Sequence, residues 1–273
     1  MSDLRQPVWL PSAALRRHAN RAASGDPDVD WLTHVRRRHF AVAPRRLLVV
    51  GAGEGHLEIA LAPHFPEAEI SGVDSDAAAI ERARSRAARR GLSRVVHEIR
   101  DLGRDPLPEG PWDAVFARNV LHRVAEPERL LRALHDALAP GGRAVLSDYV
   151  GPSHPDAAPA SRDAIRRYAR VLPIGLRFDP ESGLPFARDL PDAPPVLAMA
   201  RAVFVEEGVY RGGGGLIQPL LAPGVTRNAR LDGLDERLVG FLGDAEDDLR
   251  ARGLVGDVFA IFVGRRRVDT RVT

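Results

Sequence analysis

Short apolar runs and helical patterns alternate from residue 45 to residue 149, and this alternation constrains the fold more than any other feature. The apolar runs, each typical of a strand, cover residues 46–50, 68–74, 94–101, 112–120 and 143–150. Helical patterns occupy residues 56–64, 75–91 and 126–142. Strands that alternate with helices of this length form βαβ units and a parallel sheet with helices on both faces. The sequence therefore predicts a doubly wound α/β fold.

The regular alternation stops outside this central part of the chain. We expect one compact domain with four parts: an N-terminal helical lid (1–44), a core (45–150), a cap or substrate region (151–230), and a closing helix with the last strand of the core (231–273). Four consecutive glycines stand at residues 212–215. They indicate either a mobile hinge or a tight passage for a neighbouring backbone.

The composition excludes several classes of protein. The chain has 273 residues, a formal net charge of +2 and no Cys, and its 39 basic residues are all Arg. So small a net charge gives no field that attracts nucleic acid or an anionic membrane surface. No apolar run reaches the roughly 20 residues that span a bilayer. We expect a cytoplasmic, bacterial protein that binds neither nucleic acid nor membrane, whereas the sequence indicates no particular oligomeric state.

A turn rich in glycine joins the first strand to the first helix. This glycine turn, residues 51–55, reads GAGEG within LLVVGAGEGHLEIALA. Such a turn leaves backbone N–H groups free at the start of a helix and lets a ligand approach the main chain. The spacing differs from the dinucleotide fingerprint G-x-G-x-x-G, and no Gly-Lys-Ser/Thr follows, which excludes a P-loop. The turn indicates a site for a polar, nucleotide-like ligand.

Two aspartates follow the next two strands. Asp74 ends the second strand, where a carboxylate can accept hydrogen bonds from both ribose hydroxyls, and Asp101 ends the third. Ligands of open α/β sheets bind at these carboxyl ends of parallel strands. The alternative for Asp74 is a purely structural role as the N-cap of the following helix, for which Ser75 and Asp76 are also suited.

The order of these motifs resembles that of class I S-adenosylmethionine-dependent methyltransferases. The segments that carry the resemblance are GAGEG, VDSD, RDL, WDAVFARNVLHRV and LAPGGRAVLSDYV, over residues 45–150. The flanking parts of the chain resemble a bacterial branch of small-molecule methyltransferases. The resemblance implies a Rossmann-like seven-stranded sheet, parallel with an antiparallel edge strand, and S-adenosyl-L-methionine as the cofactor.

The resemblance also implies roles in cofactor binding. The glycine turn would pass beneath the methionine part, Asp74 would hold the ribose, and Ser75 would lie beside the adenine. Asp101 and Leu102 would meet the adenine. The cofactor-binding residues named so far are Gly51, Ala52, Gly53, Gly55, Asp74, Ser75, Asp101 and Leu102.

The end of the fourth strand completes this implied site. Arg118 and Asn119 would flank the methionyl chain and the sulfonium. One departure concerns Val49, because many members of the superfamily have an acidic residue at that position, two before the first glycine. Glu54 and Glu58 are the candidates to contact the cofactor's amino group instead, and the alternative for both is a structural role in the first turn of the helix.

Three residues near the ends of the fourth and fifth strands are candidates for the chemistry. His122 is suited to act as a base near neutral pH or to contact the substrate, and its alternative is a structural cap of the loop. Asp148 and Tyr149 follow at the fifth strand, where Tyr149 either lines the methyl channel or packs. His154 is a weaker candidate. The other His residues lack the spacing of a metal site, so we expect no metal.

The sequence thus predicts transfer of a methyl group to an O-, N- or C-nucleophile of a small molecule by in-line displacement. A cap of this size suits a secondary metabolite or a sugar, which points to natural product biosynthesis. Two alternatives stay open. One is a non-methylating reaction, in which the aminobutyrate chain of the cofactor cyclises. The other is a non-catalytic nucleotide-binding protein.

Overall fold

The computed structural model describes residues 13–151, 159–173, 195–221 and 236–267. The chain divides into two compact units. The first unit comprises residues 1–31, 150–193 and 210–260, and the second comprises residues 32–149, 194–209 and 261–273. These boundaries differ from the expected division of one domain into lid, core, cap and closing segment. The roles assigned to those four parts stay predictions.

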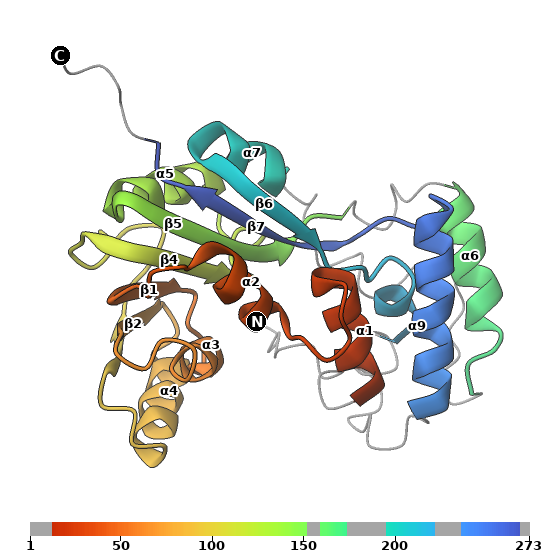
Figure 1. The fold of residues 1–273 in the computed structure, drawn as a ribbon, viewed down its shortest axis with the longest axis horizontal. Helices are drawn as coiled ribbons and strands as arrows, with labels where there is room; N and C mark the ends of the chain where they lie inside the picture. Colours follow the sequence, from red (N-terminus) through yellow and green to blue (C-terminus); the bar gives the residue numbers. More distant parts are fainter. Residues whose placement is uncertain (1–12, 152–158, 174–194, 222–235, 268–273) are drawn as a thin grey trace. The chain divides into compact units, whose positions relative to one another are not determined.

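A seven-stranded sheet, most of which belongs to the second unit, has the strand order β3-β2-β1-β4-β5-β7-β6 (Figure 1). Its strands are β1 (Arg46–Val50), β2 (Glu69–Asp74), β3 (Val95–Ile99), β4 (Trp112–Arg118), β5 (Leu138–Tyr149), β6 (Val205–Arg211) and β7 (Phe259–Arg265). The pairings from β3 through β5 are parallel. The arrows of β6 and β7 point in opposite directions in Figure 1. The predicted α/β sheet, parallel with an antiparallel edge, is confirmed.

The central strand β1 explains where a ligand can bind. Its apolar residues, 47–50, are at most 1% exposed, as expected for a strand covered on both faces. β1 pairs with β2 on one side and with β4 on the other, so the order of the strands reverses next to it. In open α/β sheets the crevice at such a reversal, outside the carboxyl ends of the strands, is where ligands bind.

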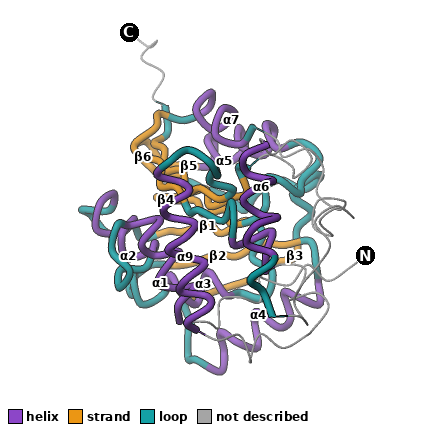
Figure 2. The backbone as a smooth tube through the Cα atoms, turned by 90° about the vertical axis from the view of Figure 1, so that its right-hand side faces the viewer, coloured by secondary structure: helices purple, strands orange, loops and turns teal. Residues whose placement is uncertain are grey.

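Helices cover this sheet on either side. The helices of the second unit are α2 (Trp31–His39), α3 (His56–Leu61), α4 (Ala77–Arg89), α5 (Pro127–Ala137) and α7 (Val196–Val203). α4 packs against β2 and β3, and α5 packs against β5 and α7. In Figure 2 α7 lies above β5, whereas α4 lies below β2.

Two elements differ from the sequence expectation. The helix predicted to run to residue 142 ends at Ala137, and β5 begins at Leu138. Leu138 pairs with Trp112 of β4 and is fully buried, so sheet pairing overrides the helical pattern there. The strand β6, with the sequence VEEGVYR, is absent from the predicted runs because it lacks an apolar pattern.

The first unit has a helical core of its own. Its helices are α1 (Ala13–Ser24), α6 (Pro159–Ala169) and α9 (Glu236–Ala251), and α1 packs on α9. Buried apolar residues from all three helices and from residues 216–221 form one cluster, which includes Leu15, Ile165, Leu216, Leu220, Leu242 and Leu249. Among the described residues no helix is long and apolar enough to cross a membrane.

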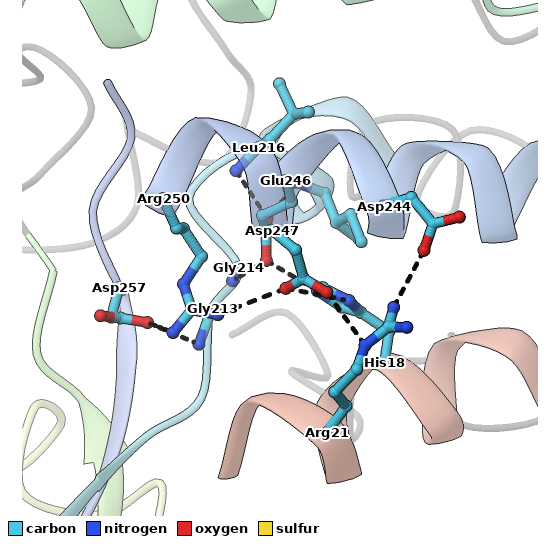
Figure 3. Close-up of polar contacts among 11 residues, drawn as sticks. His18, Arg21, Gly213, Gly214, Leu216, Asp244, Glu246, Asp247, Arg250 and Asp257 are labelled. Atoms are coloured by element: carbon cyan, nitrogen blue, oxygen red, sulfur yellow. Dashed lines mark hydrogen bonds and ion pairs between the residues drawn. The ribbon is translucent and has the colours of Figure 1, made fainter. Parts of the chain in front are cut away.

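A buried carboxylate organises this helical unit (Figure 3). Glu246 of α9 is 0% exposed and accepts hydrogen bonds from His18 Nε2 of α1 at 2.8 Å and from the backbone N–H of Gly214 at 2.7 Å. It also accepts from the N–H groups of Leu216 and Ile217, both at 2.8 Å. Burial raises the pKa of Glu246, but these hydrogen bonds outweigh burial, so its pKa is lowered. Glu246 therefore joins α1, α9 and the segment after the glycine run.

The run of four glycines is a tight passage. A Cβ atom on Gly215 would lie 2.1 Å from the carbonyl oxygen of Gly256. Gly213 and Gly214 have φ angles of 67° and 92°, in the region that favours glycine. Of the two interpretations of this run, the structure supports close passage of a neighbouring backbone.

Candidate functional site

The glycine turn is fixed to the neighbouring strand and leaves space above it. The backbone N–H groups of Gly51 and Ala52 both donate to the carbonyl of Val73, at 2.9 and 3.0 Å. A Cβ on Gly51 would lie 2.1 Å from Cγ2 of Val120, so a side chain cannot fit there. A Cβ on Gly53 would have no atom within 4 Å. The turn is therefore closed toward the protein at Gly51 and open at Gly53, where a ligand can approach the main chain.

Asp74 is held against this turn. Its Oδ2 accepts a hydrogen bond from the N–H of Gly53 at 2.8 Å, and its Oδ1 accepts from the N–H of Asp76 at 3.0 Å. The N-cap of α4 is Asp76, which accepts from the N–H of Ala79. The alternative reading of Asp74 as that N-cap is therefore wrong. Asp74 is half-buried and Ser75 is exposed, so both can meet a ligand.

Asp101 lies in the turn after β3, the strand next to β2. Its Oδ1 accepts from the N–H of Gly103 at 2.8 Å, and its own N–H donates to Oδ2 of Asp105 at 2.8 Å. Leu102 beside it is half-buried. The structure thus brings Asp74 and Asp101 to the ends of neighbouring strands, as the sequence predicts.

The chain turns sharply after β4. Asn119 has a φ angle of 54°, which is unusual for a residue other than glycine, and its N–H donates to the carbonyl of Ser147 at 2.9 Å. Residues in such conformations cluster at active sites and ligand clamps. Arg118, the last residue of β4, is half-buried, and burial lowers its pKa. Both residues therefore stand at the strand end next to the glycine turn.

His122 and Asp148 form a pair at the ends of β4 and β5. His122 Nδ1 and Asp148 Oδ1 are 2.5 Å apart, and Asp148 is 1% exposed. Asp148 also accepts from the backbone N–H groups of Val120, Leu121 and Tyr149, at 2.8 to 2.9 Å. Because these donors require an acceptor carboxylate, we assign the proton of the pair to His122 Nδ1. The Nε2 atom of His122 is then the nitrogen that can take up a proton.

Tyr149 packs beside this pair. Its ring and that of His122 are 6.1 Å apart in an edge-to-face arrangement. Burial raises the pKa of the Tyr149 hydroxyl, so it stays protonated near neutral pH. The structure therefore brings the three predicted catalytic candidates together, while His154 lies outside the described residues.

The two glutamates proposed to contact the amino group of the cofactor lie in different surroundings. Glu54 is paired with Arg82 at 2.9 Å and with Arg86, both on α4. Glu58 is 0% exposed, and burial raises its pKa from 4.5 to about 8. Its Oε1 lies 3.6 Å from Nε2 of His97.

Sequence reasoning missed this buried pair of Glu58 and His97. One signal could have found it, namely Gly72 in the middle of β2. A Cβ there would lie 2.1 Å from Oε1 of Glu58 and 2.9 Å from Cδ2 of His97. The glycine therefore makes room for both side chains beneath the sheet.

Comparisons with known proteins identify the core. Residues 48–144 match the model of a family described as a methyltransferase domain. The demethylmenaquinone methyltransferase of Thermus thermophilus is 34% identical over 137 residues, which cover 49% of this chain and 60% of that protein. A malonyl-acyl-carrier-protein O-methyltransferase of Legionella pneumophila is 28% identical over 163 residues, 59% of this chain and 56% of that protein. The matches thus span 60% or less of the length of these relatives.

Residues 48–144 form a methyltransferase domain of the class I S-adenosylmethionine-dependent superfamily. The crystal structure of the cyclase SpnF shares the fold, with a TM-score of 0.55 and 20% identity over 86% of this chain and 79% of that one. Membership of the superfamily confirms the predicted cofactor, S-adenosylmethionine. The activity of the whole protein stays a prediction at this point.

The geometry of this methyltransferase core fits that cofactor. The open approach at Gly53 suits a ligand that lies on the turn, and Asp74 beside it has a carboxylate to offer to ribose hydroxyls. The described residues include no group of three or more side chains that could hold a metal ion. The individual roles of the ten cofactor-binding residues and of His122, Asp148 and Tyr149 stay predictions.

Proposed function

We propose that this protein transfers a methyl group from S-adenosylmethionine to a small-molecule acceptor. The observation that carries the proposal is the pair of His122 and Asp148 at the same edge of the sheet as the glycine turn. A cofactor on the turn would place an electrophile at this edge, and the pair supplies a base. Support comes also from the two curated relatives, which are both named as methyltransferases.

Different residues of the core would bind different parts of the cofactor. The glycine turn and Asp74 hold the cofactor by its methionine and ribose parts, Asp101 and Leu102 hold the adenine with Ser75 beside it, and Arg118 and Asn119 flank the sulfonium. When bound, the cofactor supplies a methyl group on a sulfonium, which is an electrophile. The protein aligns the acceptor with it and excludes water.

His122 removes the proton of the acceptor. Nε2 of His122 takes a proton from a hydroxyl or amine while that group attacks the methyl carbon. With the cofactor bound, the methyl group would pass in line to the acceptor, and the electron pair of the carbon–sulfur bond would stay on the sulfur of a neutral thioether. Asp148 holds the ring by Nδ1–H and stabilises the imidazolium that forms.

The identity of the methyl acceptor is also part of this proposal. The relatives are named for methylation of demethylmenaquinone and of a malonyl group on a carrier protein. We propose a small molecule of natural product biosynthesis and a bacterial, cytoplasmic enzyme. The roles of residues 1–44 as a lid and of residues 151–230 as an acceptor-binding cap are part of this proposal.

Product analysis tests the function. The purified protein is incubated with S-adenosylmethionine and small-molecule extracts, and the nucleoside products are separated by mass spectrometry. S-adenosylhomocysteine together with a product heavier by one methylene is expected. The Asp74→Ala variant serves as a control that should lose cofactor binding. Failure of the wild-type protein to bind S-adenosylmethionine by calorimetry would refute the proposal.

A second candidate function is a non-methylating reaction on the same scaffold. SpnF, which shares the fold, is named a [4+2]-cyclase, so this scaffold is not restricted to proteins named as methyltransferases. Cyclisation of the aminobutyrate chain would release methylthioadenosine in place of S-adenosylhomocysteine, so the same experiment separates the two. Cofactor binding without any product would support a non-catalytic nucleotide-binding protein.

A further inference from the structure

Arg118 is a half-buried cation without a partner among the described residues. Every other half-buried arginine in the described part of the chain pairs with a protein oxygen atom. These arginines are Arg46, Arg86, Arg100, Arg143, Arg166, Arg250, Arg265 and Arg266. Arg118 is the exception in this set.

An unpaired guanidinium in such a place is unfavourable. Burial strips water from Arg118, which is why its pKa is lowered. Removing a charge from water is unfavourable unless an opposite charge compensates for it, and a guanidinium keeps its charge at any ordinary pH. A buried cation that lacks a protein partner is typical of a site where a bound anion neutralises its charge.

The surroundings of Arg118 identify where this anion would lie. Arg118 directly follows Ala117, which pairs with Val50 at the end of β1. Val120, two residues further on, packs under Gly51. The charge of Arg118 also contributes to the lowered pKa of His56, although burial and Arg86 contribute more. Since His56 directly follows Gly55, the guanidinium lies on the side of the glycine turn.

Three described carboxylates near the glycine turn have partners other than Arg118. Glu54 is paired with Arg82 and Arg86. Asp74 accepts from the backbone of the glycine turn and of the α4 start. Asp148 accepts from His122 and three backbone N–H groups. Since none of these three described carboxylates pairs with Arg118, its guanidinium is left for the carboxylate of a ligand.

We propose that Arg118 binds the carboxylate of a ligand at the glycine turn by a paired, bidentate hydrogen bond. The inference rests on the proposed function, under which two ligands can supply the carboxylate: the methionyl end of the cofactor or an acidic acceptor. The planar fork of a guanidinium matches the geometry of a carboxylate.

Calorimetry with three probes tests the inference. The probes are S-adenosylhomocysteine, 5′-methylthioadenosine, which lacks the carboxylate, and malonate added to protein saturated with S-adenosylhomocysteine. Arg118→Met is compared with the wild type and with Arg90→Met, which removes an exposed arginine at the end of α4. Arg118→Lys keeps the positive charge but removes the planar guanidinium that makes two hydrogen bonds to a carboxylate.

If the cofactor supplies the carboxylate, Arg118→Met should bind S-adenosylhomocysteine about 10- to 100-fold more weakly, with 5′-methylthioadenosine unchanged. If the acceptor supplies it, S-adenosylhomocysteine affinity should stay the same and malonate binding should disappear. Arg118→Lys should fall between wild type and Arg118→Met in the affected measurement, while Arg90→Met should match wild type.

Two results would overturn the inference. One is equal affinity of wild type and Arg118→Met for both carboxylate probes. The other is an equal loss of S-adenosylhomocysteine and 5′-methylthioadenosine binding, which would show a general effect on the site. Wild-type protein that binds neither nucleoside would instead refute the proposed function, so the two failures are distinguishable.

Discussion

Asp148 is the residue that decides whether the candidate base can work. Its carboxylate accepts three backbone N–H groups and the His122 ring, and it is buried. A carboxylate satisfied in this way does not react itself. It fixes the tautomer of His122, so that Nε2 is the atom that receives a proton. Asp148 is thus a positioning residue, and its contribution can be measured apart from cofactor binding.

We expect Asp148→Asn to lower turnover by about 100-fold or more, because an amide cannot stabilise the imidazolium. Affinity for S-adenosylhomocysteine, measured by calorimetry, should change less than about twofold. Asp136→Asn is a matched control, since Asp136 pairs with His135 on the exposed surface. If Asp148→Asn keeps full turnover, the base must lie elsewhere.

Glu58 gives a prediction for pH. Its pKa in the folded protein is raised from 4.5 to about 8, chiefly by burial and further by the charge of Asp74. His97 faces it, but burial and Arg84 lower the pKa of His97, so His97 offers no positive charge to Glu58 at neutral pH. Between pH 4.5 and 8 the unfolded chain loses this proton and the folded protein keeps it, so stability falls as pH rises.

The full effect would approach about 5 kcal/mol above pH 8, counted at 1.36 kcal/mol per unit of pKa. We expect the free energy of unfolding of Glu58→Gln to fall less between pH 4.5 and pH 8 than that of the wild type, because Gln has no proton to lose. Urea unfolding at several pH values measures this. Glu69→Gln, a change at an exposed position of β2, should keep the wild-type slope. A wild-type slope in Glu58→Gln would contradict the assignment.

Single residues differ in how far the sequence predicts them. His122, Asp148 and Tyr149 are predictable as neighbours, because the ends of adjacent parallel strands meet at one edge. The state of Arg118 is not predictable, because the lack of a partner depends on every surrounding side chain. The pairing of Glu58 with His97 depends in the same way on contacts between α3 and β3.

At the scale of elements, some helices and strands follow the local apolar pattern of the sequence, whereas others are set by pairing with distant strands. β1 and α4 follow their apolar patterns to within two residues of the prediction. β6 does not, because the chain VEEGVYR becomes a strand only by pairing at the sheet edge. The start of β5 at Leu138 is likewise set by pairing with Trp112 of β4. Elements defined by partners distant in sequence are the ones that local pattern cannot locate.

The contact of α9 with α1 and the glycine run depends on Glu246. We expect Glu246→Gln to destabilise the first unit by about 3–5 kcal/mol, because an amide nitrogen would face the N–H groups of Leu216 and Ile217. Asp244→Asn on the same helix breaks only an exposed pair with Arg21 and should cost about 0–1 kcal/mol. Unfolding followed by circular dichroism measures both, and equal stability of the two variants would contradict this role of Glu246.

The pH dependence of this contact has the opposite sign to that of Glu58. The pKa of Glu246 is lowered in the folded protein, so the stability that it contributes is present above the ordinary pKa of a glutamate. It is lost as pH falls through the lower folded-state value. Acid should therefore weaken the first unit, whereas rising pH weakens the second unit through Glu58.

At the scale of the whole molecule, the two units have separate cores and the chain passes between them several times. The proposed cofactor site consists of residues of the second unit alone, since residues 51–55, 74–75, 101–102, 118–119, 122 and 148–149 all belong to it. A ligand stabilises the segments that must be folded to bind it. The cofactor should therefore act mainly on the second unit.

Hydrogen exchange with and without S-adenosylhomocysteine measures this distribution. At a ligand concentration of 100 times Kd, local opening of the site should be suppressed about 100-fold. We expect this protection in β1, α3 and the end of β2, and little change in α1, α6 and α9. Asp74→Ala should abolish it at the same ligand concentration. Protection confined to the helices of the first unit would place the nucleoside away from the glycine turn and would contradict the assigned site.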